Sequence, residues 1–387
     1  MRPIPFLRAC VLTLGTAMPL TAIADTGYSV EVLQPGLDRP WAMAHLPGGG
    51  DLLITGRGGD LWHWQPEGGL TPLAGLPDVD DRGQGGLLDV ALDPDFAANG
   101  RVWLSWAGAG GRAGRGEAST HLGHARLNLQ DGRLDDLQTV FVAQPFMISP
   151  AHFGSRIVFA DGHLFMGLGD RAQKDFGPNH VAQRLDSENG AVIRLRLDGT
   201  IPAVNPFAGR SGAAGAIWSH GHRNIQAMAV QPGTGQLWVA EHGENGGDEI
   251  NIVQRGGNYG WPLASHGTTY RGGQVFSPPH QPGDGFIAPV WHAPAGREAP
   301  YPPSGMSFYS GAAFDGWQGD MLLGNLGQRY LGRFTLDGDT PVLSQRLLDG
   351  RDWRIRDVAV GPEDGLIYVL TDGEDGALVR LSPGDAP

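Results

Sequence analysis

Polar side chains gather at both ends of a predicted β-hairpin in the middle of the chain. Two apolar runs, Ala227–Val230 and Leu237–Ala240, are separated by the sequence Gln-Pro-Gly-Thr-Gly at residues 231–235. Proline and glycine in that position predict a turn between two antiparallel strands. Arg223 and Asn224 precede the first strand, and a glycine-spaced acidic segment follows the second. Because the two outer ends of a hairpin lie together, both groups are expected to border one pocket.

The two ends of this hairpin suit different ligands. An arginine presents a planar fork of donors, and with a neighbouring amide it suits a flat ligand rich in oxygen. The acidic segment, which contains Glu244, Asp248 and Glu249, has the carboxylates and flexible carbonyls that a hard cation such as calcium prefers. Each group alone is also compatible with ordinary turn residues or a solvated loop. The prediction of a shared pocket therefore depends on the position of the two groups at the ends of one hairpin.

Further polar side chains stand just before other predicted strands. Gln84 precedes the strand predicted at 86–92, His152 precedes that at 155–159, and Arg354 and Arg356 open the one at 355–360. His152 is the candidate general base, because an imidazole titrates near neutrality and can accept a hydroxyl proton. Asp170, which follows a strand in Gly-Leu-Gly-Asp, could orient a neighbouring group, although Gly-Asp is also an ordinary turn.

The elements that position these residues form a repeating pattern of strand, turn and strand. Six copies of the pair are predicted, at 41–54, 86–104, 155–167, 227–240, 305–323 and 355–370. A strand pair cannot bury both of its faces alone, so the copies are expected to stack around an axis. The pattern predicts an all-β fold, a six-bladed β-propeller, with a pair of β-sandwiches as the rival. The long gaps 170–217 and 262–304 are expected to be loops on the functional face.

Composition and the N-terminus indicate an exported protein. Met1–Ala24 combines two arginines, an apolar run and a small-residue cleavage site, which is typical of a secretory signal peptide. We therefore expect residues 25–387 to form a single propeller domain, periplasmic or secreted. The only cysteine, Cys10, lies in the signal, and no apolar stretch is long enough to span a membrane. A formal charge of −13 with one lysine, Lys174, argues against nucleic acid as a partner.

Four motifs in the second half of the chain resemble a known family. They are Gly-His-Arg-Asn-Ile-Gln at 221–226, Glu-His-Gly-Glu at 241–244, Asp-Glu-Ile-Asn at 248–251 and Gly-Gly-Asn-Tyr-Gly-Trp-Pro at 256–262. Together they resemble the soluble aldose sugar dehydrogenases, relatives of soluble glucose dehydrogenase. The resemblance extends over most of the chain after the first few dozen residues. It implies the cofactor pyrroloquinoline quinone (PQQ) together with calcium.

The resemblance also implies roles for individual residues. His152 lies in a His-x-Gly-x-Arg-hydrophobic motif and matches the catalytic base. The positions implied to bind PQQ are Gln84, Arg223, Asn224, Arg354 and Arg356. Gly243 and Glu244 match carbonyls that hold the cofactor's calcium, while Asp248, Glu249 and Tyr259 match positions linked to structural calcium. The chain departs from the family where a lysine is usual, near Asn325–Arg329, and Arg329 is the candidate substitute.

The reaction implied is oxidation of the anomeric C1 of an aldose to a lactone. His152 would remove the C1 hydroxyl proton, Arg223 and calcium would stabilise negative charge on the quinone, and an external acceptor would receive the electrons. The chain has no Cys-x-x-Cys-His sequence for a haem, so that acceptor is expected to be a separate molecule. Two alternatives stay open from the residues: a calcium-dependent propeller lactonase or other hydrolase, and a non-catalytic binding propeller.

Overall fold

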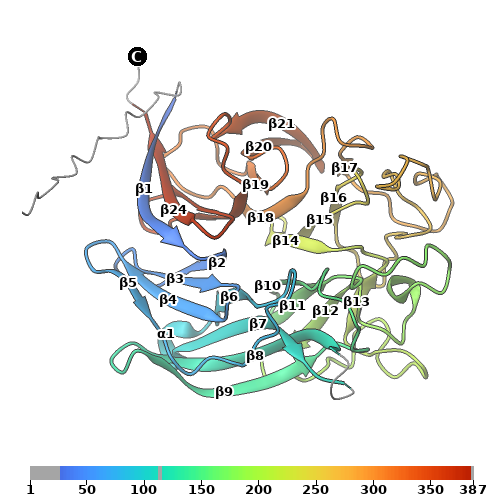
Figure 1. Ribbon diagram of the computed structural model, residues 1–387, viewed down its shortest axis with the longest axis horizontal. Coiled ribbons are helices and arrows are strands. Elements are labelled where there is room, and N and C mark those ends of the chain that lie inside the picture. The colour runs from blue at the N-terminus through green and yellow to red at the C-terminus, as the bar shows by residue number, and fades with distance from the viewer. Residues whose placement is uncertain (1–26, 112–115, 385–387) are drawn as a thin grey trace, which may run out of the picture.

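The chain folds as a ring of β-sheets. The computed structural model describes residues 27–111 and 116–384, and its strands form six four-stranded sheets arranged around a common centre (Figure 1). The predicted six-bladed β-propeller is therefore confirmed. The predicted signal peptide, residues 1–24, lies outside the described residues.

Each sheet, or blade, is built from antiparallel strands that follow one another in the chain. From the centre outwards, the first blade contains β2 (Pro40–His45), β3 (Leu52–Gly56), β4 (Asp60–Gln65) and β5 (Gly69–Pro72). The second contains β6 (Leu87–Leu92), β7 (Arg101–Ala109), β8 (Ala118–Asn128) and β9 (Arg133–Val142). The third contains β10 (Gly154–Ala160), β11 (His163–Leu168), β12 (Ala191–Arg196) and β13 (Ile217–His220). The fourth contains β14 (Ile225–Val230), β15 (Leu237–Glu241), β16 (Glu249–Ile252) and β17 (Trp291–His292). The fifth contains β18 (Pro303–Phe308), β19 (Met321–Asn325), β20 (Tyr330–Asp337) and β21 (Thr340–Leu347).

The sixth blade joins the two ends of the described chain. It contains β22 (Ile355–Val360), β23 (Ile367–Thr371) and β24 (Gly376–Pro383), and its outermost strand is β1 (Tyr28–Leu37). Pairing of β1 with β24 adds the fourth, outermost strand to this blade and so joins the two ends of the ring, as Figure 1 shows.

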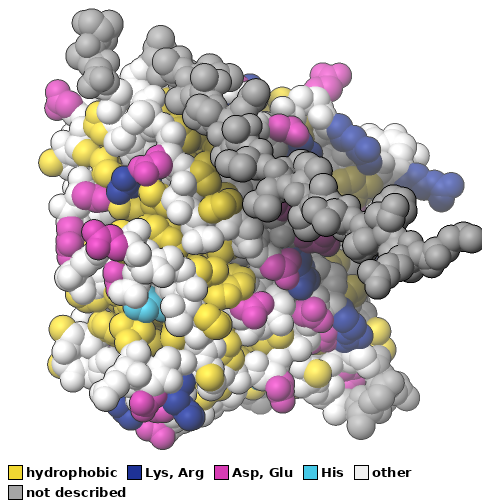
Figure 2. All heavy atoms as spheres, turned by 60° about the vertical axis from the view of Figure 1, so that its left-hand side comes forward, with side chains coloured by type: hydrophobic (Ala, Val, Ile, Leu, Met, Phe, Trp, Pro, Cys, Tyr) yellow, Lys and Arg dark blue, Asp and Glu magenta, His cyan; other side chains and the backbone are white. Residues whose placement is uncertain are grey.

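The core lies between neighbouring blades. Leu53 and Leu61 of the first blade pack in one buried cluster with Val102 and Leu104 of the second, and similar clusters fill the other interfaces. Burial of these apolar faces holds the ring together and leaves both ends of the innermost strands open to polar residues. On the flank turned forward in Figure 2, acidic side chains are scattered among apolar ones.

The two long gaps predicted to be loops also contain outer strands, so that prediction is wrong in part. The gap 170–217 holds β12 and a short 3₁₀ helix (Val181–Gln183), and the gap 262–304 holds β17 and the start of β18. The one α-helix in the described ranges, α1 (Phe96–Asn99), is a single turn. None of the helices described is long and apolar enough to cross a membrane.

Candidate functional site

A cavity lies at the end of the ring where the innermost strands begin. Four predicted residues line it: Gln84, Asn224, Arg354 and Arg356. The structure adds Trp41, Arg57, Leu88, Phe153, Gly154, Gln226, His242, Leu326 and Asp372. Residues from strands more than 300 positions apart in the chain therefore meet at one place, as a propeller axis requires.

An irregularity at the start of every innermost strand turns side chains into this cavity. In all six blades the register between the first and second strand shifts within the first residues. Such bulges bend a strand and change the direction of a side chain. Trp41, Leu88, Gln226 and Arg356 lie within four of these shifts, and all four line the cavity.

The cavity has an excess of positive charge. It is lined by three guanidinium groups, from Arg57, Arg354 and Arg356, and by one carboxylate, Asp372. Asp372 accepts from Nε of Arg354 at 2.9 Å and from Nη2 of Arg356 at 2.9 Å. Although burial alone would raise it, these arginines hold the pKa of Asp372 below its ordinary value. Two positive charges therefore remain for an anionic ligand.

Neither His152 nor Arg223 is among the residues that line the cavity. His152 directly precedes Phe153 and Gly154, which do line it, and is paired with Asp170. The main-chain N–H of His152 donates to the side chain of Gln84 at 2.9 Å, and its ring Nδ1 lies 2.7 Å from Oδ1 of Asp170. Asp170 Oδ2 accepts from the indole N–H of Trp261 at 2.8 Å. A side chain at Gly169 would place its Cβ 2.3 Å from the carbonyl oxygen of His152, so glycine permits this close approach.

The surroundings of His152 keep its ring neutral. Burial and the nearby Arg223 lower the pKa of His152 below its ordinary value, against the opposing effect of Asp170. Burial would raise the pKa of Asp170, but His152 and Arg223 hold it below its ordinary value. An ionised Asp170 accepts the Nδ1 proton, and the Nε2 lone pair is then free to take a proton from a substrate.

Arg223 is buried beside this pair but is partly neutralised. Its Nη2 lies 2.5 Å from Glu244, whose carboxylate also binds Lys174 at 2.7 Å. Its Nη1 donates to the carbonyl of His242 at 3.1 Å. The Nε–H of Arg223 is buried without a hydrogen-bond partner in the described structure. An unpaired buried donor of this kind fits a ligand oxygen that the protein alone does not supply.

Three of the five residues predicted to bind calcium, Gly243, Glu249 and Tyr259, line one small cavity beside Arg223. Asp248 accepts from the N–H groups of Gly243 and Tyr301 at 2.9 and 2.8 Å, so its carboxylate organises the backbone. The Tyr259 hydroxyl donates to the carbonyl of Ile252 at 2.6 Å. Glu249 also lies in a group with His266 and His280.

Arg329 is separated from the cavity. It follows β19 with a φ of 61°, forms an ion pair with Asp352 and leaves 43% of its side chain exposed. It is not among the cavity-lining residues, whereas Leu326, three positions earlier, is. Arg329 therefore does not supply a guanidinium to this cavity, because its backbone direction and Asp352 hold it at the surface.

Four of the nine lining residues that the structure adds share one signal. In an antiparallel pair the second strand ends beside the start of the first. Arg57 follows β3, His242 follows β15, Leu326 follows β19 and Asp372 follows β23. A search for residues directly after each second strand would have found all four.

Comparisons with known proteins agree with this architecture. A model of the family described as glucose/sorbosone dehydrogenase matches residues 37–380. The chain is 45% identical over 365 residues to aldose sugar dehydrogenase YliI of Escherichia coli (strain K12), which covers 93% of this chain and 94% of that protein.

Two solved structures show the same arrangement of strands. The apo-form of the soluble aldose sugar dehydrogenase from Escherichia coli superposes with a TM-score of 0.86 at 44% identity, covering 92% of this chain and 100% of the other. The PQQ-bound form of aldose sugar dehydrogenase from Streptomyces coelicolor gives a TM-score of 0.73 at 27% identity, covering 92% and 98%.

Proposed function

This chain belongs to the glucose/sorbosone dehydrogenase family, and from that premise we propose that it is a PQQ-dependent aldose sugar dehydrogenase. The proposed reaction oxidises C1 of an aldose to the lactone. The observation that carries the proposal is the positive cavity lined by Arg57, Arg354 and Arg356 beside the His152–Asp170 pair. Oxidation of C1 with PQQ requires a base beside a binding site for a polyanion. Family membership favours this function over a hydrolase or a binding propeller.

The cavity's own residues fit PQQ, a flat tricarboxylate. Arg57, Arg354 and Arg356 would bind its carboxylates with charge-assisted hydrogen bonds. The amides of Gln84 and Asn224 would bind its carbonyl oxygens, and the unpaired Nε–H of Arg223 would add a further donor. When bound, PQQ would supply the two-electron oxidant that the protein's side chains lack.

His152 would act as the general base. Its neutral ring would accept the C1 hydroxyl proton at Nε2, because Nδ1 donates to Asp170. Trp261 holds the other oxygen of Asp170, so the carboxylate and the imidazole keep a fixed orientation. Asp170 would also stabilise the imidazolium that forms.

Calcium is proposed at the backbone carbonyls of Gly243 and Glu244. These residues follow the end of β15, next to Arg223. Asp248 would support the ion indirectly by holding the N–H of Gly243. The cation and Arg223 would stabilise negative charge on the cofactor.

Two further parts of the proposal concern export of the protein and the acceptor of its electrons. The signal peptide predicted at 1–24 would export the protein to the periplasm or beyond. Because the sequence has no haem attachment motif, we propose a separate electron acceptor.

Titration of PQQ into the purified apo-protein, followed by quenching of tryptophan fluorescence, tests the cofactor assignment. Binding should be saturable with one PQQ per chain. The variant Arg356→Gln should bind at least about 10-fold more weakly, a loss near 1.4 kcal/mol. Arg126→Gln, which changes an exposed arginine on β8 paired with Asp135, should bind like the wild type. Absence of saturable binding, or equal affinity in the two variants, would refute the assignment.

A further inference from the structure

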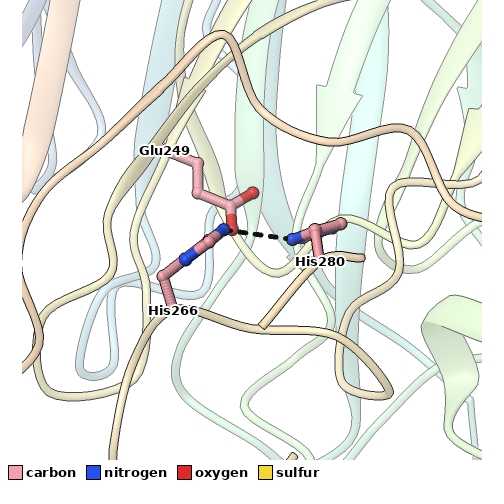
Figure 3. A group of neighbouring side chains, drawn as sticks. All are labelled: Glu249, His266 and His280. Carbon is pink, nitrogen blue, oxygen red and sulfur yellow. Dashed lines mark hydrogen bonds between the residues drawn. The ribbon is translucent and has the colours of Figure 1, made fainter. Parts of the chain in front are cut away.

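Three side chains of types that bind metals meet at the fourth blade. None of them lines the cavity of the three arginines, but Glu249 lines a smaller cavity next to it with Arg223. Glu249 begins β16, and His266 and His280 belong to the long segment between Trp261 and β17. One ligand atom from each lies within 4.8 Å of the other two, and Figure 3 shows the three side chains pointing toward one another. Nδ1 of His280 is 3.4 Å from Nε2 of His266. Two nitrogens about 2.0–2.1 Å from a tetrahedral zinc ion are roughly that far apart.

The hydrogen bonds of His280 leave the correct nitrogen free. Its Nε2 lies 3.1 Å from the main-chain carbonyl of Tyr259. A carbonyl can only accept, so Nε2 carries the proton and Nδ1 carries a lone pair directed at His266. A histidine that binds a metal commonly donates its other N–H to a backbone carbonyl in this way.

The ring of His266 is also held in place and uncharged. It stacks on His292 with ring centres 3.7 Å apart and planes at 9°. Burial, followed by the proximity of His292 and His280, lowers the pKa of His266 to about 4. The ring is therefore neutral at neutral pH, and it can bind a metal through Nε2 when its proton is on Nδ1. His292 supports the ring from one face and takes no part in the cluster itself.

In the described part of the chain no arginine or lysine forms an ion pair with Glu249, although Arg223 lines the same small cavity. Glu249 is 9% exposed, and the side-chain donor next to it is the amide of Asn251 at 3.3 Å. Burial, with Glu241 adding to the effect, raises the pKa of Glu249 well above its ordinary value. A carboxyl group in this position is stabilised in its charged form when a cation binds.

We propose that Glu249, His266 and His280 form a binding site for a divalent transition metal of the zinc class. Two imidazoles and one carboxylate match zinc and its neighbours, whereas calcium requires six to eight oxygens. Glu249, which the family resemblance assigned to calcium, therefore has nitrogen-donor neighbours that favour a different metal. The two histidines are half-buried, so an ion can reach the group from solvent. The ion would fasten the segment that carries His266 and His280 to β16.

This proposal does not rest on the proposed enzymatic function, and its test uses no PQQ and no activity assay. Untagged protein is treated with a chelator and titrated with Co²⁺, whose visible absorption reports nitrogen coordination, and then with Zn²⁺. One Co²⁺ should bind per chain, Zn²⁺ should displace it, and an excess of Ca²⁺ should not. Binding of Zn²⁺ should also raise the melting temperature.

Single substitutions locate the ion. His266→Asn and His280→Asn should each weaken Co²⁺ binding at least about 100-fold. His163→Asn, a change at the first residue of β11 in the third blade, should leave it unchanged. Both histidines are partly exposed, so these variants are expected to fold, whereas Glu249→Gln changes a buried group and serves as a further check. The proposal is overturned if Co²⁺ does not bind saturably, if the double variant His266→Asn/His280→Asn binds as tightly as wild type, or if Ca²⁺ displaces Co²⁺ at equal concentration.

Discussion

The His152–Asp170–Trp261 chain of hydrogen bonds fixes which nitrogen of His152 is available. Both oxygens of Asp170 are occupied, one by His152 Nδ1 and one by the indole of Trp261. The carboxylate cannot turn without losing a buried hydrogen bond, which costs about 1–3 kcal/mol. The free lone pair of His152 is thus set by residues that never touch a substrate.

Replacing His152 with alanine should remove the base but keep the cofactor site. General base catalysis contributes about 10²- to 10⁴-fold, so kcat with aldose, PQQ and calcium should fall by that factor. PQQ affinity, measured by fluorescence titration, should stay close to wild type. His163→Ala, at the far end of the same strand pair, is the matched control. Undiminished turnover in His152→Ala would show that another group removes the proton.

The pH dependence of turnover should reflect the lowered pKa of His152. Burial and Arg223 lower this pKa from 6.5, so the ring stays neutral and active as the pH falls through 6.5. The acidic limb of kcat/KM against pH should therefore lie below pH 6.5. The limb should be missing from the residual activity of His152→Ala. A midpoint above 6.5, or a limb that survives in the variant, would contradict the role of His152.

At the scale of the strand, the first two strands of each blade were predictable and the outer two were not. All six predicted pairs coincide with the inner pairs, from β2 and β3 to β22 and β23, because these strands are buried on both faces and form continuous apolar runs. Outer strands such as β9, with alternating half-exposed residues, have a weaker pattern. The bulges that aim Trp41 and Gln226 into the cavity are also invisible in sequence, because a shift in register depends on the partner strand.

Arg156 shows how the innermost strands are held together near the axis. It belongs to β10, and its Nη1 lies 3.0 Å from Asp357 of β22 and 3.5 Å from Asp89 of β6. Its guanidinium also stacks 4.1 Å from the ring of Trp41 on β2. Despite Arg156, burial raises the pKa of Asp89 to about 7. The arginine of the predicted catalytic motif therefore has a structural role.

Substitution of Arg156 by methionine should destabilise the protein in a pH-dependent way. Breaking a buried ion pair costs about 3–5 kcal/mol, because it leaves uncompensated charge. The folded-state pKa values of Asp89 and Asp357 already lie above 3.8 and would rise further. Carboxyls with raised pKa values favour folding at low pH and lose that contribution as the pH rises through the folded value.

Urea unfolding of Arg156→Met should accordingly show a larger loss of stability at about pH 8 than at about pH 5. Arg126→Met, which removes an exposed ion pair with Asp135, should change stability by less than about 1 kcal/mol at either pH. An equal loss at both pH values would mean that Arg156 acts through packing alone.

For the whole molecule, closure of the ring depends on a contact that the sequence does not reveal. β1 pairs with β24, and Ser29 lies directly opposite Ser382. The segment Tyr28–Leu37 has an irregular pattern of exposure, and its partner lies 353 residues further along at that pair. Local periodicity predicts strands but not such distant partners, so the closing strand was missed even though the six-bladed ring was predicted correctly.

A disulfide between positions 29 and 382 should stabilise the ring. The two hydroxyls are 2.6 Å apart, and directly opposed strand residues have the spacing that a disulfide requires. In a chain begun at residue 25, the variant Ser29→Cys/Ser382→Cys has no competing cysteine. Closing so long a loop is expected to add up to about 5 kcal/mol. The oxidised protein should unfold at higher urea than the reduced one, and Ser29→Cys alone should show no such difference. Equal midpoints for oxidised and reduced double variant would contradict β1 as the closing strand.

We propose that this ring holds PQQ beside His152 and uses it to oxidise sugars. The most direct measurement is reduction of a redox dye by the purified apo-protein with an aldose, before and after PQQ and calcium are added together. We predict that dye reduction appears only when protein, aldose, PQQ and calcium are all present. A protein that binds PQQ but reduces no dye with any of a panel of aldoses would contradict the account.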